Sequence, residues 1–188
     1  MSMTTISLFG IALLAALGGA VLFRIFPMVH TYFLYRGKRI VTCPETLMPE
    51  AVDVAAGKAA LSAFRGEPEP RLKWCSRWLE RRDCGQECLR QIESDPDNCL
   101  VSNIVSNWYE GQSCACCHER FGRLRYYMDP PALMRRDGTT ISWDEFAPQQ
   151  LPKIFSSHKP VCFDCHVTET FRRVHPEVVT GWKGWRPS

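Results

Sequence analysis

Two pairs of cysteines constrain the fold of this chain more than any other feature of its sequence. Cys114 and Cys117 form one C-x-x-C pair, Cys162 and Cys165 form another, and a histidine follows each pair. A C-x-x-C turn presents two sulfurs to one point, and two such turns supply four ligands to a tetrahedral metal ion when the fold brings them together. The sequence therefore predicts an α+β domain of short strands and helices that is stapled by metal.

The composition narrows the classes of function. The chain has 188 residues and ten cysteines, a high cysteine content that is typical of disulfide scaffolds or metal sites. The formal net charge is +3, but residues 1–39 contain basic residues and no acid, so the rest of the chain is close to neutral. A near-neutral domain lacks the positive surface of nucleic-acid-binding proteins. We expect no nucleic-acid partner.

The N-terminal segment is apolar. Residues 6–23 carry no charge, which is about the minimum length for crossing a bilayer, and Ile25 and Phe26 lengthen the run. A cleaved signal peptide would have basic residues ahead of the apolar run, and none precedes this one. The sequence therefore predicts an uncleaved transmembrane anchor over residues 1–26.

Basic residues after this segment predict the orientation of the chain. They are Arg24, Arg36, Lys38 and Arg39. The positively charged flank of a span normally stays in the cytoplasm, so we expect a single-pass protein of the inner (cytoplasmic) membrane with its domain in the cytoplasm. Residues 27–42 would form a basic and aromatic segment at the membrane interface, including Tyr32, Phe33 and Tyr35. Cytoplasmic thiols stay reduced, which favours metal binding over disulfides.

The rest of the chain divides by pattern into three predicted segments: a cysteine-rich helical subdomain over 43–110, a module with the paired C-x-x-C motifs over 111–176 and a flexible tail over 177–188. Apolar periodicity and turn residues predict strands over 40–44, 71–75, 123–127 and 139–143, the last two as a hairpin. They predict helices over 84–93, 100–108 and 168–174, and a short apolar turn over 151–155.

The histidine after each pair leaves two metal centres open. C-x-x-C-H is the attachment motif of c-type haem, in which the cysteines form thioethers and the histidine ligates iron. The pairs thus resemble those of c-type cytochromes, which implies two covalent haem c groups, ligated by His118 and His166, in a periplasmic domain that carries electrons. Candidate distal ligands are His158, His175, Met128 and Met134.

The alternative is zinc. CACCHERFG, residues 114–122, resembles the zinc-knuckle form C-x-x-C-G-K-x-F-G, with His118 in place of the glycine. VCFDCHVTETFRR resembles a second knuckle that opens a helix. This resemblance covers residues 112–175 and implies a treble-clef-like or ribbon module with a hairpin between the knuckles and Phe121 over the sulfurs. In this model the four cysteines hold one zinc ion and neither histidine is an essential ligand.

The upstream cysteines Cys43, Cys75, Cys84 and Cys88 are candidates for a second site. Cys84 and Cys88 are four residues apart, on one face of the predicted helix, and the set would suit zinc or an iron–sulfur cluster. Buried thiols that pack as small apolar side chains are the other explanation. The order CPET, CSRW, C-x-x-x-C and two C-x-x-C pairs is similar to an uncharacterised bacterial family of membrane-anchored, cysteine-rich proteins. That family implies no known activity.

No cysteine is marked as a nucleophile, so the pattern favours a role without catalysis. The leading hypothesis is a membrane-anchored, zinc-ribbon-like protein that acts in interaction or assembly at the membrane with a protein partner. The alternative hypothesis is a membrane-anchored dihaem cytochrome that acts as an electron carrier.

Overall fold

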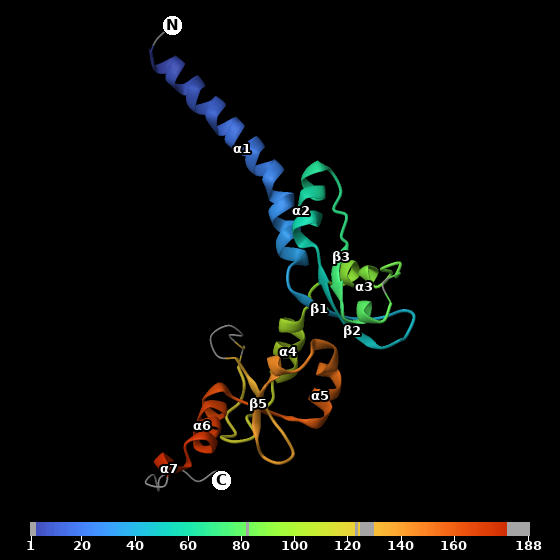
Figure 1. The fold of residues 1–188 in the computed structure, drawn as a ribbon. Coiled ribbons are helices and arrows are strands. Elements are labelled where there is room, and N and C mark those ends of the chain that lie inside the picture. Colours follow the sequence, from blue (N-terminus) through green and yellow to red (C-terminus); the bar gives the residue numbers. More distant parts are fainter. Residues whose placement is uncertain (1–2, 82, 123, 125–129, 180–188) are drawn as a thin grey trace. The chain divides into compact units, whose positions relative to one another are not determined.

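The computed structural model has the α+β class that the sequence predicts (Figure 1). It describes residues 3–81, 83–122, 124 and 130–179, with the side chains of the first helix described from Gly10. The chain divides into two compact units. The first unit contains residues 1–37 and 52–96, and the second contains residues 38–51 and 97–188.

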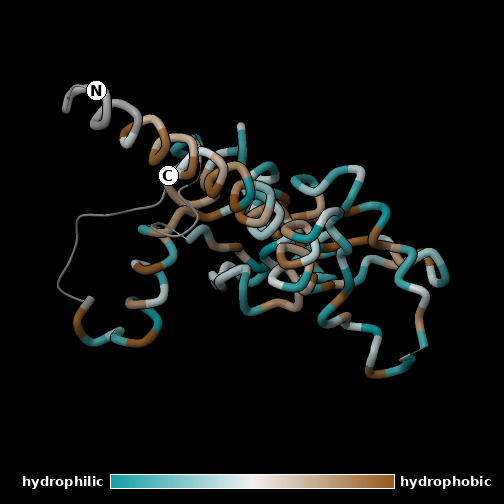
Figure 2. The backbone as a smooth tube through the Cα atoms, turned by 90° about the horizontal axis from the view of Figure 1, so that it is seen from above, coloured by the Kyte–Doolittle hydropathy of each residue, from teal (hydrophilic) through white to brown (hydrophobic). Residues whose placement is uncertain are grey.

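Helix α1 (Met3–Tyr35) is the long apolar element of the first unit. Within the described part of the chain it is the one helix long and apolar enough to cross a membrane, and Figure 2 shows it mostly in the tan and brown of hydrophobic residues. Its 33 residues extend about 50 Å, against about 30 Å for the hydrocarbon core of a bilayer. The helix therefore continues well past residue 26, through Pro27, before it ends.

The end of α1 packs against α2 (Ala56–Arg65), which lies beside it (Figure 1). One face of α2 is buried and consists of alanines: Ala56, Ala59, Ala60 and Ala63. Small side chains let two helix backbones approach closely. Near the end of α1, Thr31 and Tyr35 are buried as well. Tyr35 therefore belongs to this core, whereas Tyr32 and Phe33 are exposed. The membrane interface predicted for residues 27–42 stays a prediction.

The first unit also contains the paired residues of two antiparallel strands, beginning at Val52 in β2. β2 (Pro49–Val54) pairs with β3 (Leu72–Cys75), and Val52 lies opposite Cys75. The 3₁₀ helix η1 (Ser76–Leu79) and helix α3 (Leu89–Ser94) follow. The strand predicted over 71–75 is confirmed.

The helix predicted over 84–93 is wrong at its start, because α3 begins only at Leu89. Gln86 has a left-handed backbone, with φ of 56°, which an α-helix does not accommodate. Its side-chain oxygen accepts a hydrogen bond of 2.8 Å from the N–H of Leu72, so the segment is tied to β3 instead. Cys84 and Cys88 therefore do not share one face of a helix.

The second unit begins with β1 (Lys38–Thr42), as predicted for this segment. The N–H of Cys43 donates to the carbonyl of Met48 and closes the turn toward β2, and the strand order of this sheet is β1-β2-β3. Strand alternation turns Arg39 and Val41 to the buried side. Arg39 is only 1% exposed, so its side chain packs inside the protein.

A second three-stranded sheet, with the order β5-β4-β6, organises the remainder of this unit. β4 (Ala132–Met134) pairs antiparallel with both β5 (Thr140–Ser142) and β6 (Lys159–Val161). The turn between β4 and β5 has Gly138 with φ of 82°, a conformation that suits glycine. The strand predicted over 123–127 lies outside the described residues apart from Leu124, and the strand that pairs with β5 is β4.

Helix α4 (Val101–Tyr109) packs its apolar face against this sheet. The buried cluster consists of Val101, Val105, Tyr109, Leu133, Ile141 and Leu151. The 3₁₀ helices η2 (Trp143–Glu145) and η3 (Pro148–Gln150) lead into α5 (Leu151–Ser157), a helix where the sequence predicted a turn. Phe155 on α5 stacks on Trp108 at 4.4 Å between ring centroids. This contact joins α5 to α4. Helices α6 (Phe163–Val174) and α7 (Pro176–Val179) end the described chain.

Candidate metal centre

The first cysteine pair lies in a tight hairpin turn. Ser113 and Arg120 form the bridge at its base, and the N–H of Cys114 donates to the carbonyl of Glu119 at 2.9 Å. His118 closes the turn with a hydrogen bond to the carbonyl of Cys114 and has φ of 61°. This left-handed conformation is the one that glycine adopts at no steric cost. His118 thus occupies a position where a zinc knuckle has glycine.

The second pair lies where β6 passes directly into α6. Cys162 is the N-cap residue of α6, and Cys165 is in its first turn. The N–H of His166 donates to the carbonyl of Cys162 at 3.0 Å and begins the helical hydrogen bonding. Residues three apart on a helix lie on one side, so the helix directs both sulfurs to the same point.

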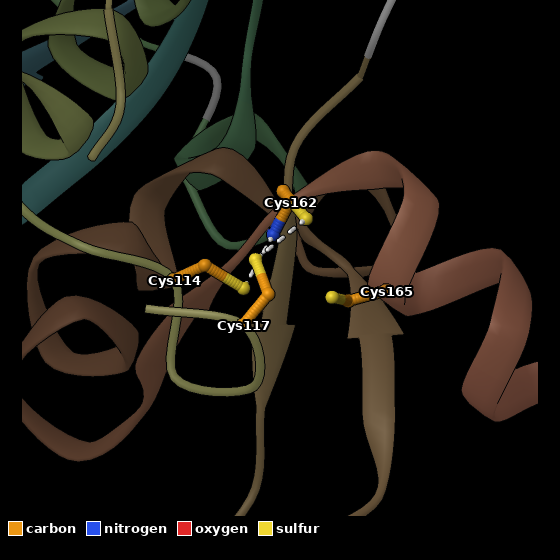
Figure 3. A group of neighbouring side chains, drawn as sticks. All are labelled: Cys114, Cys117, Cys162 and Cys165. Carbon is orange, nitrogen blue, oxygen red and sulfur yellow. Dashed lines mark hydrogen bonds between the residues drawn. The ribbon is translucent and has the colours of Figure 1, made fainter. Parts of the chain in front are cut away.

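Strand β6 brings the two turns together. The N–H of Ala115 donates to the carbonyl of Pro160 at 2.8 Å, and the N–H of Cys162 donates to Sγ of Cys114 at 3.3 Å. Figure 3 shows the four cysteine side chains converging from the turn and the start of the helix. Strand pairing with β4 thus positions the second knuckle, since β6 is paired along its length.

The distances between the sulfurs fit one metal ion. The four Sγ atoms of Cys114, Cys117, Cys162 and Cys165 lie within 4.8 Å of one another. Sγ of Cys117 and Sγ of Cys162 are 3.8 Å apart. In a tetrahedral site with metal–sulfur bonds of about 2.3 Å, sulfurs are separated by about 3.8 Å. The group therefore has the spacing of a four-sulfur metal site.

Without a cation, the four thiols of this group cannot all ionise at low cost, because burial and mutual repulsion disfavour their thiolates. Burial would raise the pKa of the Cys114 thiol, but the backbone N–H groups of Cys117, Cys162 and Cys116 favour its thiolate and lower the pKa to about 7. Burial raises the pKa of Cys162 to about 11, and it raises the pKa of Cys165 far above its usual range. A divalent cation at the centre would stabilise all four as thiolates.

Apolar packing covers part of the group, whereas Cys117 is exposed. Cys114 and Cys165 are buried beside Ala132 and Val161, and Phe121 packs against the same cluster. The expectation that Phe121 covers this region agrees with that contact. Cys116 is buried in the cluster as well, and burial, followed by the charge of Cys114, raises its pKa to about 11. Its side chain therefore favours the neutral thiol and behaves as a small apolar group.

The histidines have other contacts. Among the described residues, the group of converging ligand atoms contains no histidine. His118 is exposed, and Nδ1 of His166 lies 2.9 Å from the hydroxyl of buried Thr140. Burial lowers the pKa of His166. The sequence did not indicate this role of Thr140, because the two residues meet only when β5 and α6 pack together.

The remaining candidate ligands are spread over the chain. His158 Nδ1 lies 2.9 Å from the hydroxyl of Ser157, and His175 packs against Phe171. Met134 borders the sulfur cluster through β4, and Met128 lies outside the described residues.

The upstream cysteines are not gathered in the same way. Cys43 belongs to the second unit, whereas Cys75, Cys84 and Cys88 belong to the first. Within the described ranges, the structure gathers one group of three or more potential metal ligands, the four cysteines above. A second metal site at the upstream cysteines stays a prediction.

Comparison with other proteins identifies no family for this chain. No family model, no curated protein and no solved structure matches the chain.

Proposed function

We propose that this chain is a single-pass membrane protein whose second unit is stapled by a structural zinc ion, and that it acts in interaction or assembly at the membrane. The observation that carries the proposal is the convergence of four cysteine sulfurs within 4.8 Å, from two separate turns. Four protein ligands fill a tetrahedral site and leave no open position for substrate or water, which is typical of structural zinc. The hairpin between the pairs and the helix after the second pair support the treble-clef-like interpretation.

The same geometry weighs against the haem hypothesis. Each haem c needs its own pair of thioethers and its own axial histidine, so two haems require two separate cysteine pairs. The 3.8 Å distance between Cys117 and Cys162 joins the pairs and supports one shared ion. Iron accepts the same four-sulfur geometry as zinc, but its sulfur complexes are coloured and zinc sites are colourless.

The test compares Cys117→Ser with His118→Gly in the full chain, produced with haem-maturation enzymes. The wild type should hold about one colourless metal ion per four-sulfur site. Cys117→Ser should lose the zinc, whereas His118→Gly should keep it and melt at the same or a slightly higher temperature, because glycine adopts a φ of 61° freely. A Soret band in the wild type that disappears in His118→Gly would show that the zinc assignment is wrong.

The membrane part of the proposal rests on α1 and its flanking charges. The positive-inside rule places the C-terminal part of the chain in the cytoplasm. Fusions after Ser188 to a periplasmic phosphatase and to a fluorescent protein test this. The fluorescent fusion should be bright and the phosphatase fusion inactive. The reverse pattern would put the domain in the periplasm and strengthen the haem hypothesis.

An apolar stripe on α6 supports interaction with a protein partner. Val167, Phe171 and Val174 are 47%, 48% and 59% exposed. They lie at positions i, i+4 and i+7, on the side of the helix away from Cys165. Exposed apolar stripes of this kind mark surfaces that pack against other helices or proteins.

Substitution of this stripe tests the interaction. Phe171→Ser with Val174→Ser should leave the zinc content unchanged, because both side chains face away from the sulfurs. It should reduce the mass of the complex that contains the protein in mild detergent. A wild type that already runs as a monomer in its micelle would refute the interaction role.

A further inference from the structure

The first unit contains an open cavity of about 700 Å³ that the metal site does not explain. Its walls come from the end of α1, the end of β2, the start of α2 and the start of β3. A volume of this size accommodates a small organic molecule and exceeds what one inorganic ion needs.

Cations dominate the polar lining of the cavity. The basic residues are Arg36, Lys58, Arg71 and Lys73. Asp53 is the acidic residue of the lining, and its carboxylate lies 3.7 Å from Nζ of Lys73. Among the residues that the structure describes, Arg36, Lys58 and Arg71 form no ion pair. The cavity therefore carries an excess of positive charge that no carboxylate in its walls neutralises.

The start of α2 adds hydrogen-bond donors to this wall. Its N-cap residue is Ala55, which has no side-chain oxygen, and no side-chain hydrogen bond caps the helix. Ala56 and Gly57 line the cavity, and their N–H groups belong to the first turn, where an α-helix has no internal acceptors. Oxygen atoms of a phosphate group suit such donors, since the helix dipole also favours negative charge there.

Two aromatic side chains complete the lining and favour a ligand that has an organic part. Tyr32 and Trp78 contribute to the walls beside the cations. We propose that this cavity binds a phosphate ester, with the phosphate against Arg36, Lys58, Arg71 and the start of α2, and the organic part along Tyr32 and Trp78. Because Tyr32 and Arg36 lie at the end of the candidate span, the ester has two possible sources, a soluble metabolite or the headgroup of an anionic phospholipid. This proposal does not depend on the metal site.

Binding of glycerol 3-phosphate to the full chain tests the proposal. The protein is placed in nanodiscs of phosphatidylcholine, and the affinity is measured by calorimetry. Lys58→Gln with Arg71→Gln should lower the affinity about tenfold or more, because charged hydrogen bonds to phosphate are lost. Lys58→Arg should preserve binding. Arg65→Gln with Arg90→Gln removes two exposed charges of the same unit outside the cavity and should leave the affinity unchanged.

Nanodiscs that contain phosphatidylglycerol distinguish the two sources. If the lipid headgroup is the ligand, phosphatidylglycerol should occupy the cavity, and binding of glycerol 3-phosphate should disappear in these discs. If a soluble ester is the ligand, binding should be the same in both kinds of disc. The proposal is overturned if the wild type binds neither glycerol 3-phosphate nor phosphatidylglycerol, or if the control pair of substitutions lowers the affinity as much as the cavity pair.

Discussion

The two units of this protein form their cores by different means. In the first unit, the alanine face of α2 packs against α1, and the contact consists of small apolar side chains. In the second unit, the buried cysteines Cys114, Cys116 and Cys165 occupy part of the core beside Ala132 and Val161. Apolar contacts need no ligand to be stable. Four cysteine sulfurs within 4.8 Å of one another, two of them from buried residues, need a cation to be thiolates together. The comparison teaches that a metal ion would take part in the core of the second unit, whereas the helix contact in the first unit needs none.

Removal of metal should produce the largest effect. Zinc contributes about 10–16 kcal/mol of apparent binding free energy in zinc-finger peptides, which is comparable with the whole stability of a domain. A strong chelator should therefore unfold the second unit and spare the contact of α1 with α2. Limited proteolysis with mass spectrometry should find new cleavage within residues 97–179 and little within 52–81, and added zinc should reverse it. Unchanged cleavage after complete loss of zinc would contradict the comparison.

A second metal site at the upstream cysteines would remove this difference between the units, because Cys75, Cys84 and Cys88 belong to the first unit. The sequence prediction of that site requires about two metal ions per chain, one for each four-thiolate set. Cys84→Ser with Cys88→Ser should then reduce the count to about one. A single ion in the wild type, unchanged by this double substitution, would show that these thiols only pack.

Overpacking of the helix contact should destabilise the first unit alone. Ala59 is fully buried on the face of α2 that packs against α1, so Ala59→Leu has no space for its added atoms. Such substitutions cost about 1–3 kcal/mol. Denaturant unfolding should show the loss, with zinc content unchanged. Leu61→Ala, an exposed position on the same helix, is the control and should change stability by less than about 0.5 kcal/mol. Equal losses in both variants would argue against a tight contact.

The smallest effect is expected for Tyr109→Phe in the second unit. Tyr109 is fully buried, and its hydroxyl donates to the carbonyl of Ala132 in β4. Loss of one buried hydrogen bond costs about 1 kcal/mol. The substitution should lower the melting temperature of the second unit slightly without releasing zinc. Tyr32→Phe, at an exposed tyrosine, should have no effect, and zinc release by Tyr109→Phe would show that this residue supports the metal site directly.

The sequence was informative where spacing alone defines the chemistry. The two C-x-x-C pairs, the apolar N-terminal helix and the strands near residues 40 and 72 follow from local patterns, because periodicity and turn residues act over a few positions. It was misleading at Cys84–Glu93, since the hydrogen bond between Gln86 and Leu72 links residues from different elements. The burial of Tyr35 and Arg39 was not evident from the sequence, because charged and aromatic side chains near a span are typical of surfaces.

The amino-acid sequence by itself determined that four cysteines in two pairs, after one apolar helix, are available for metal, because ligand spacing within a turn is a local property. Only the tertiary structure decided that the sulfurs of these pairs lie close enough together to hold one ion. The β4–β6 pairing carries Cys162 to within 3.3 Å of Cys114, measured from backbone nitrogen to sulfur. It also decided the contact of His166 with Thr140, since these residues come from different segments, whereas the left-handed turn at His118 is closed by local hydrogen bonds. Convergence of this kind depends on strand register and helix packing, which no local pattern specifies.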